Sequence, residues 1–259
     1  MLLVIDVGNT NIVLGIYSQK SLVQDWRIPT YRKNTVGELH LTLNQLFQTS
    51  GIQLSQIDQI VIACVVPSVA KHLVSFCEKH VKASVFWIDT ATQSFMPNLC
   101  VPASDLGADR LVNALGAHHL HPNEDLIVID FGTATTFDVI SAKGEYKGGV
   151  IAPGIQISSE ALSRKAARLP RVELFVIPEK IVGTNTVACM QSGIIYGYAA
   201  MVEGMIGRIA QELGVMSRVI ATGGFAALLA KTCSVISAVH PTLTLEGLRC
   251  VAELVWPKP

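Results

Sequence analysis

The sequence predicts an α/β protein made of two similar halves, each a mixed β-sheet with helices. Apolar runs typical of strands alternate along the chain with stretches of helical periodicity. A run that ends in aspartate and leads into a glycine turn occurs twice, and sliding the chain by 124 positions superposes the two occurrences. That shift places Ile5-Asp6 on Ile129-Asp130, Gly8 on Gly132 and Ile16 on Ile140. Repetition of a whole strand–turn–strand unit is stronger evidence of architecture than local propensity.

The boundary between the halves is predicted at the polar loop 121–124, whose sequence is His-Pro-Asn-Glu. A chain of 259 residues is long enough for two small domains, each with a core of its own. The expected domains are therefore 1–120 and 121–259.

Five strands and three helices are predicted in the first half. Val, Ile and Leu dominate strand-like runs at 2–7, 12–17, 22–28, 57–65 and 85–88. The turn Gly8-Asn9-Thr10-Asn11 joins the first two runs, and its residues are those that favour turns. Apolar spacing predicts a helix over 35–49 that ends at Gly51. A second helix is predicted to begin at Pro67-Ser68, and a third, rich in small residues, is predicted over 105–119.

The second half repeats this order. Strand-like runs occupy 126–130, 137–140, 150–151 and 217–221, and helical patterns occupy 157–169, 187–213 and 246–255. Pro170 ends the first of these helices. Glycines recur along 187–213 and each costs roughly 1 kcal/mol relative to Ala in a helix. We therefore expect this helix to pack closely, either against the sheet or against another subunit.

Composition excludes several classes of protein. Half of the residues are hydrophobic and the mean hydropathy is +0.42, which excludes a disordered chain. Lys+Arg and Asp+Glu each total 20, so the balanced charge gives no support to nucleic-acid binding. No apolar run approaches the roughly 20 residues that cross a bilayer, and residues 1–5 lack the basic start of a signal peptide. We expect neither nucleic acid nor membrane as a partner.

The cysteines and histidines predict no metal site of their own. Six cysteines are widely spaced without a C-x-x-C pair, as expected for buried thiols in a reducing cytoplasm. His118, His119 and His121 cluster before Pro122, but no carboxylate or cysteine stands near them at ligand spacing. We expect a cytoplasmic protein in which these histidines close a helix.

Three strand-to-glycine turns are the candidates for chemistry. They begin at Asp6, Asp130 and Ala221 and contain Gly8, Gly132 and Gly223-Gly224. Glycine lets backbone N–H groups approach phosphate oxygens, and a carboxylate at a strand end can hold Mg²⁺. A single such turn is equally explained as a hairpin with an Asx-turn aspartate. Two of them at matching points of a repeat favour nucleotide binding.

The order of these motifs resembles the ATPase superfamily of actin, heat-shock chaperones and sugar kinases, and more closely the type III pantothenate kinases. The resemblance covers nearly the whole chain. It is carried by D-x-G-N-T (6–10), G-A-D-R-L-x-N-A (107–114), D-x-G-T-A-T-T (130–136), G-G-x-I-x-P-G (148–154), N-T-x-x-x-x-Q-S-G (185–193) and T-G-G (222–224). It implies two ribonuclease H-like (actin-like ATPase) halves with the active-site cleft between them.

The resemblance also implies a reaction and its site. The expected activity is ATP-dependent phosphorylation of pantothenate to 4'-phosphopantothenate, the first step of coenzyme A biosynthesis, with Mg²⁺ and a monovalent cation, K⁺ or NH₄⁺, in a homodimer. Residues implied to bind ATP are Asp6, Val7, Gly8, Asn9, Thr10, Asn11, Ile12, Val13 and Thr133, with Asp6 near the Mg²⁺. Residues implied to bind pantothenate are Gly107, Ala108, Asp109, Arg110 and Thr186. Asp130 is implied to hold the monovalent cation.

The residues themselves support Asp109 as the catalytic base. An alcohol that attacks a γ-phosphate needs a group to accept its proton, and a carboxylate can do so. The alternative is an ordinary first-turn aspartate favoured by the helix dipole. Arg110 is a candidate to bind the carboxylate of pantothenate, since guanidinium binds carboxylate in a bidentate manner. The alternative interpretation is that Arg110 is an ordinary solvent-exposed arginine of a helix.

One segment departs from the family pattern. The family often carries a tyrosine that approaches pantothenate just before G-A-D-R, whereas residues 98–106 here contain none. Three rival functions are considered: another small-molecule kinase of the superfamily, a regulatory relative of the Bvg accessory factors with a vestigial site, and a nucleotide-binding interaction module. Intact Asp6, Asp109, Asp130 and Thr133 argue against a vestigial site.

Overall fold

The computed structural model describes residues 1–31, 35–90 and 93–257. The chain divides into two compact units, of which the first comprises Met1–Leu120 together with Leu243–Pro259 and the second His121–Thr242. The chain passes between units after residue 120, at the expected boundary. The final helix was expected in the second half, but it packs within the first unit.

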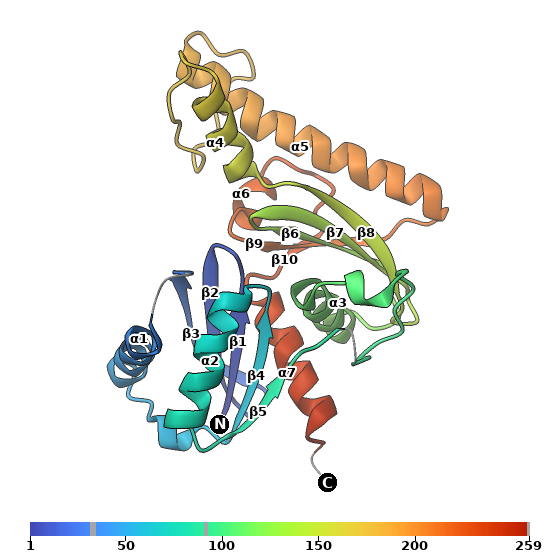
Figure 1. Ribbon diagram of the computed structural model, residues 1–259. Helices are drawn as coiled ribbons and strands as arrows, with labels where there is room; N and C mark the ends of the chain where they lie inside the picture. Colours follow the sequence, from blue (N-terminus) through green and yellow to red (C-terminus); the bar gives the residue numbers. More distant parts are fainter. Residues whose placement is uncertain (32–34, 91–92, 258–259) are drawn as a thin grey trace. The chain divides into compact units, whose positions relative to one another are not determined.

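The first unit is a five-stranded mixed sheet covered by helices on both faces (Figure 1). The strand order is β3-β2-β1-β4-β5, and the strands span Leu2–Val7 (β1), Asn11–Ser18 (β2), Ser21–Pro29 (β3), Gln59–Cys64 (β4) and Ser84–Trp87 (β5). The β1–β2 and β2–β3 pairs are antiparallel, whereas β1–β4 and β4–β5 are parallel. Its helices are α1 (Val36–Thr49), α2 (Pro67–His80), α3 (Ala108–Leu120) and α7 (Leu243–Val255).

Alternation along β1 assigns each residue to one face of this sheet. Leu3 and Ile5 are fully buried in the apolar cluster that contains residues of α1 and α2. Leu2 and Val4 belong to the cluster that contains residues of α3 and α7. Because strand side chains alternate between faces, Asp6 lies on the face covered by α3 and α7.

The second unit repeats the same topology, with strand order β8-β7-β6-β9-β10 when read in the matching direction. The strands span Leu126–Phe131 (β6), Ala134–Ile140 (β7), Tyr146–Pro153 (β8), Arg218–Gly223 (β9) and Ala238–Val239 (β10). Two antiparallel and two parallel pairings occur in the same places as in the first unit. The predicted internal repeat is therefore present in the fold.

The register shows that the second glycine turn is one residue shorter than the first. Leu3 pairs with Ile16 on β2, and the equivalent Ile127 pairs with Val139 on β7. The shift of 124 thus holds only up to the turn, and Ile16 corresponds to Val139 instead of Ile140. The alignment of Ile16 with Ile140 was wrong for this reason.

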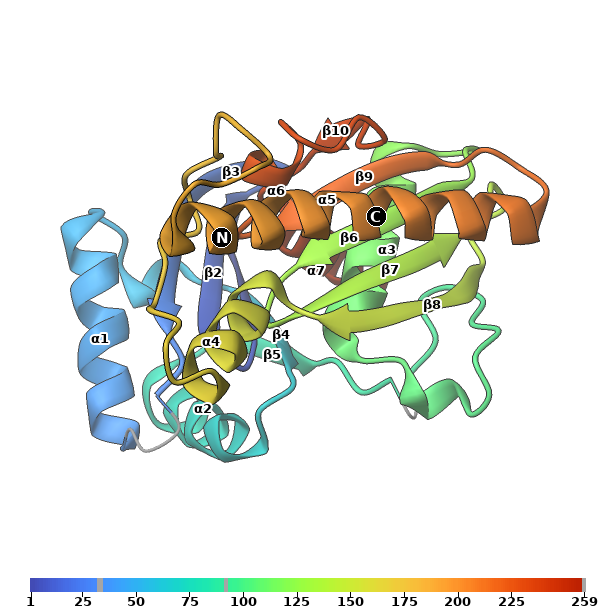
Figure 2. The ribbon, with the colours of Figure 1, turned by 90° about the horizontal axis from the view of Figure 1, so that it is seen from above.

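Three helices belong to the second unit: α4 (Ile155–Lys165), α5 (Thr186–Leu213) and α6 (Ala226–Leu229). Figure 2 shows the long α5 lying along the sheet of its unit. Its buried residues, such as Ile195 and Val202, pack with Ile129 and Phe137 of the sheet. Glycine positions on α5 are exposed, and a Cβ added at any of them meets no atom of the described residues within 4 Å, apart from the backbone of α5 itself. Close packing of these glycines against the sheet is thereby excluded.

Several element boundaries differ from the predictions. Residues Ala103–Asp105 form a separate 3₁₀ turn, so α3 begins at Ala108, and α4 ends at Lys165, before Pro170. The short elements α6 and β10 were not predicted. The four-residue α6 buries only Ala226 and Leu229, and the two residues of β10 are half-buried, so neither element gives a periodic signal.

The final helix joins the first unit because two glycines let it approach α3. A Cβ on Gly247 would lie 1.8 Å from the carbonyl oxygen of Val112, and a Cβ on Gly116 would lie 2.9 Å from the Gly247 nitrogen. Only residues without side chains fit at such a backbone contact. Thr244 also donates a hydrogen bond to Asn113 at 2.7 Å. These contacts explain why α7 packs with a helix far from it in sequence.

The cysteines are all free, and three of them are buried as expected, namely Cys77, Cys233 and Cys250. Burial raises the pKa of the Cys77 and Cys233 thiols to about 11, so both stay protonated at neutral pH. Cys189 is exposed. Within the described part of the chain, no helix is both long and apolar enough to span a membrane.

Candidate active site

The first glycine turn lies between β1 and β2 and is tied to the end of β3. Gly8 N–H donates to Asn11 O at 3.0 Å, which closes the turn. Thr30, after β3, donates its hydroxyl to Gly8 O at 2.8 Å and its N–H to Thr10 O at 2.8 Å. Asn9 and Thr10 are exposed, as a phosphate-binding turn requires, while the flanking Val7 and Ile12 are buried. Thr30 was not predicted, because no local motif marks a residue that acts across two strands.

Asp6 precedes this turn at the end of β1. It is half-buried, faces Val13 across the β1–β2 pair and lies beside Ala63 on β4. Asn11 and Val13 are likewise half-buried. The stretch 6–13 implied to bind ATP is therefore a single hairpin, with its carboxylate on the sheet face that α3 and α7 cover.

The G-A-D-R segment forms the start of α3. Leu111 N–H donates to Gly107 O at 3.0 Å, and Arg110 N–H donates to Asp109 Oδ1 at 2.9 Å. A Cβ on Gly107 would lie 2.5 Å from Asp109 Oδ1, so the glycine gives the carboxylate its room. Ala108 is buried in the apolar cluster between the sheet and the helices α3 and α7, whereas Asp109 and Arg110 are half-exposed. Asp109 therefore keeps solvent access at the first turn of a helix that packs on the Asp6 face of the sheet.

The second glycine turn lies between β6 and β7. Gly132 N–H donates to Ala134 O at 3.1 Å, and both Gly132 and Thr133 are exposed. Asp130 is half-buried, faces Thr136 and lies beside Thr222. A Cβ on Gly223 would lie 2.5 Å from Asp130 Oδ1, which explains the glycine in the late T-G-G motif.

Thr186 is the first residue of α5 and is exposed. Asn185 caps the helix, since its Oδ1 accepts from Ala188 N–H at 2.9 Å. The predicted residues thus fall into two sets. Those of 6–13 and 107–110 lie in the first unit, while Asp130, Thr133 and Thr186 lie in the second.

The loop that lacks the family's tyrosine is organised by Asn98. Its Nδ2 donates to Ala103 O at 3.0 Å, and its Oδ1 accepts from Cys100 N–H at 3.0 Å. A cavity of about 240 Å³ lies beneath this loop, and Phe95, Asn98 and Leu106 contribute to its lining. Asn98 was not predicted as a site residue, because the motif begins only at Gly107.

The carboxylates Asp6 and Asp130 fit a metal–nucleotide complex. Magnesium binds one or two carboxylates together with phosphate oxygens and waters. Each aspartate is half-buried at a strand end and is followed by a turn with exposed residues. Their oxygen donors are of the type that Mg²⁺ and K⁺ accept.

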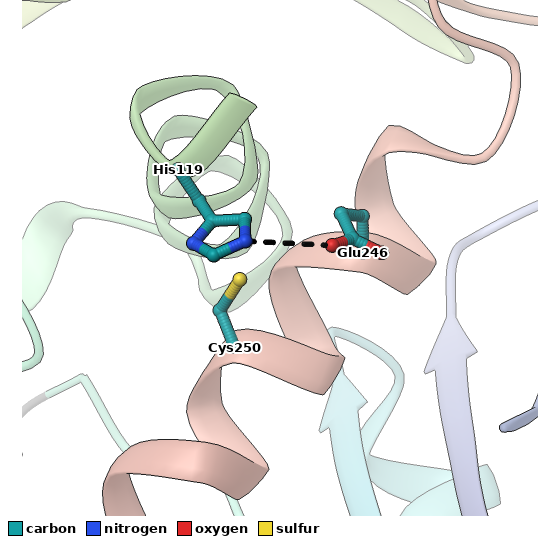
Figure 3. Close-up of side chains that lie close together, drawn as sticks. All are labelled: His119, Glu246 and Cys250. Carbon is teal, nitrogen blue, oxygen red and sulfur yellow. Dashed lines mark ion pairs between the residues drawn. The ribbon is translucent and has the colours of Figure 1, made fainter. Parts of the chain in front are cut away.

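Another group of potential metal ligands already surrounds a cation of the protein. Among the described residues, ligand atoms of His119, Glu246 and Cys250 lie within 4.8 Å of one another (Figure 3). Arg249 Nη2 lies 3.1 Å from His119 Nε2, 2.5 Å from Glu246 Oε1 and 3.6 Å from Cys250 Sγ. The guanidinium thus lies among all three ligand atoms.

This arginine is buried and strongly held. Burial alone would lower the pKa of Arg249, but the hydrogen bond to Glu246 and the nearby carboxylates raise it above its ordinary value. Burial raises the pKa of the Cys250 thiol to about 12, so no thiolate is offered at neutral pH. The cluster is therefore an ion-pair network that holds α3 to α7.

Comparison with known proteins assigns the fold first. A hexokinase of the ROK type from Thermus thermophilus superposes with a TM-score of 0.51 at 14% identity, covering 95% of this chain and 96% of that one. A Campylobacter jejuni protein described as a Baf family transcriptional activator superposes with a TM-score of 0.59 at 18% identity, with 98% of each chain covered. The fold is that of the actin-like ATPases and sugar kinases, as predicted.

The sequence assigns the family. A family model described as type III pantothenate kinase matches residues 2–208. A type III pantothenate kinase of Desulforapulum autotrophicum is 49% identical over 254 residues, covering 98% of this chain and 97% of the relative. This chain belongs to the type III pantothenate kinase family.

Proposed function

We propose that this protein transfers the γ-phosphate of ATP to the 4'-hydroxyl of pantothenate and so begins coenzyme A biosynthesis. Membership of the family over nearly the whole chain is the observation that carries this proposal. The two glycine turns and the G-A-D-R helix start supply the groups that such a reaction needs. The structural likeness to a Baf family protein concerns the fold alone and does not favour a regulatory function.

Asp109 acts as the general base in this proposal. Its carboxylate takes the proton of the pantothenate hydroxyl while that oxygen forms a bond to the γ-phosphorus and the bond to the β–γ bridging oxygen breaks, which releases ADP. Gly107 leaves space at the carboxylate, and Arg110 binds the carboxylate of pantothenate. Thr186 completes the substrate contacts.

The two turns hold the nucleotide. Backbone N–H groups of Asn9 and Thr10 and the Thr133 hydroxyl donate to phosphate oxygens. Asp6 would hold the Mg²⁺ that accompanies ATP, and Asp130 would hold K⁺ or NH₄⁺. When bound, these cations neutralise charge on the phosphates.

Exposed small residues on α5 support a homodimer. Gly193, Gly197, Ala200, Gly204 and Gly207 are all exposed and recur at spacings of four and three, which places them on one face of the helix. A second copy of α5 could approach this face closely. Sedimentation should give a dimer at micromolar protein and a shift toward monomer in Gly204→Arg, whereas a monomeric wild-type protein would contradict the proposal.

The direct test is a coupled assay of ATP consumption with pantothenate, run in K⁺, NH₄⁺, Na⁺ and ion-depleted buffers. We expect turnover that requires pantothenate and Mg²⁺ and that is higher with K⁺ or NH₄⁺. Equal rates in all the buffers would contradict the monovalent-cation site. Absence of pantothenate-dependent turnover would contradict the function itself.

The general base is tested by Asp109→Asn. Removal of a general base costs on the order of 10²–10⁴ in rate, and we expect kcat to fall by that factor with little change in nucleotide affinity. Asp105→Asn is the matched control, because Asp105 is exposed and lies just before the motif. If Asp109 were only a helix-start residue, the variant would lose roughly 1 kcal/mol of stability and keep its turnover.

A further inference from the structure

Tyr198 joins the long helix α5 to the second glycine turn. Its side chain is buried on the sheet side of α5. Its hydroxyl lies 2.6 Å from Thr135 Oγ1 and 2.6 Å from Pro153 O. Thr135 is the second residue of β7, two positions after Thr133, and is fully buried. Pro153 is the last residue of β8 and pairs with Ala134. One phenol thus bonds to β7, which follows the turn, and to β8, which pairs with the start of β7.

The chemistry of the three groups fixes the direction of both hydrogen bonds. A tyrosine hydroxyl carries one proton and can also accept. The Pro153 carbonyl can only accept, so the Tyr198 proton points to it. Thr135 must then donate its own proton to the Tyr198 oxygen. Burial raises the pKa of Tyr198, which keeps this proton in place at neutral pH.

A second contact carries this constraint from Pro153 to the turn itself. Gly154 N–H donates to Thr133 O at 3.1 Å. A Cβ on Gly154 would lie 2.3 Å from Thr133 O and 2.6 Å from Gly132 O, so the two backbones are in direct contact. Tyr198 therefore holds the turn from one side through Thr135 and from the other side through Pro153 and Gly154.

We propose that Tyr198 is a positioning residue that fixes the turn Gly132–Ala134 for nucleotide binding. The contribution of Tyr198 to ATP binding rests on the proposed function, in which Thr133 contacts ATP. Its contribution to the conformation of the turn does not rest on that function, because it follows from contacts within the protein alone. The same helix begins at Thr186, so one rigid element links the turn to the proposed pantothenate contact.

Tyr198→Phe tests this role, because it removes the hydroxyl and keeps the ring. It leaves the Thr135 hydroxyl and the Pro153 carbonyl without the partner that each has now. Loss of one or two hydrogen bonds of ordinary strength corresponds to roughly a five- to thirtyfold change in an equilibrium constant. We expect the Kd for ATP to rise by about that factor, while KM for pantothenate changes less than twofold.

Tyr146→Phe is the matched control. Tyr146 is fully buried in the same sheet and donates to Asp138 at 2.6 Å, but it pairs with Ile140 at the other end of β7 from the turn. We expect this variant to change the melting temperature without changing the Kd for ATP. A rise in Kd of the same size in both variants would reduce Tyr198 to a general stabiliser of the unit and overturn the proposal.

Hydrogen exchange measured without nucleotide separates this proposal from the proposed function. The amides of Gly132 and Gly154 donate within and beside the turn, and both should exchange about fivefold or more faster in Tyr198→Phe than in Tyr146→Phe. Unchanged exchange of both amides would overturn the proposal even if the protein is an active kinase. Faster exchange with no detectable ATP binding by wild-type protein would uphold the link to the turn and overturn the proposed function.

A double-mutant cycle tests whether Tyr198 acts on the turn through its hydrogen bond to Thr135. Thr135→Val keeps the shape of the side chain and removes its hydroxyl. If Tyr198 acts through Thr135, the double variant should weaken ATP binding by less than the product of the two single effects. Fully multiplicative effects would show that the residues act separately and would overturn the Thr135 path.

Discussion

Gly154→Ala places a single methyl group against the second glycine turn. Gly154 has φ −67° and ψ 156°, a conformation that any L-residue adopts. The substitution therefore adds no backbone strain of its own, and its whole effect comes from the collision of the new Cβ. That Cβ would lie 2.3 Å from Thr133 O and 2.6 Å from Gly132 O.

The size of the effect follows from these distances. Real Cβ atoms essentially never approach other heavy atoms closer than 3.0 Å, so the turn must recede from position 154 by at least about 0.7 Å. A misplacement of about 1 Å at an active site costs roughly 10²-fold in rate. We expect kcat/KM for ATP to fall by about 10- to 100-fold. Overpacking by a methyl group costs about 1–3 kcal/mol, or roughly 2–12 °C in melting temperature for a chain of this length.

Steady-state kinetics and thermal unfolding on the same protein preparation test this expectation. Gly37→Ala is the control, since Gly37 is exposed in α1, and among the described residues the nearest atom to its added Cβ outside the helix backbone is Thr35 Oγ1 at 3.9 Å. The control should keep wild-type kinetics and gain up to roughly 1 kcal/mol of stability. Wild-type kcat/KM for ATP in Gly154→Ala would refute the inference that the position of this turn matters for nucleotide binding.

Two further substitutions probe the packing of the units. Gly247→Ala would place a Cβ 1.8 Å from Val112 O, so α7 must move away from α3. We expect the free energy of unfolding to fall by about 1–3 kcal/mol or more. An unchanged melting temperature would contradict the close helix contact. His240 lies 3.4 Å from His121, Nε2 to Nε2, and burial, followed by the charge of His121, lowers the pKa of His240 below 6.5. The unfolded chain then binds the proton more readily, so stability should fall as pH drops below about 6.5, and His240→Gln should flatten that fall; identical pH profiles would contradict the assignment.

The sequence predicts the topology because the evidence for it is local. Strand runs and glycine turns are contiguous segments, and their repetition places equivalent strands in equivalent order. The closing helix was assigned to the wrong unit because its neighbours in sequence belong to the second unit. Its position depends on the contact of Gly116 with Gly247, which are far apart along the chain and give no periodic signal.

The candidate site divides in the same way. Residues 6–13 and 107–110 form contiguous motifs, and the structure places them on one hairpin and one helix start. Thr30 and Tyr198 escaped prediction because each acts through backbone carbonyls of distant residues. A hydrogen bond to a carbonyl imposes no residue type on its partner, so the sequence carries no trace of it.

The repeat also bears on the proposal that two equivalent carboxylates hold different cations. Asp6 and Asp130 occupy the same register position, but their neighbours on the adjacent parallel strand differ. Cys64 pairs with Val7, and Gly223 pairs at the equivalent position with Phe131. Gly223 leaves Asp130 Oδ1 the space that a Cβ would take, at 2.5 Å, whereas a cysteine side chain occupies the corresponding position in the first unit. A larger ion with long, flexible oxygen contacts suits the more open carboxylate, which supports the proposal that Asp130 holds the monovalent cation and Asp6 the Mg²⁺ of the nucleotide.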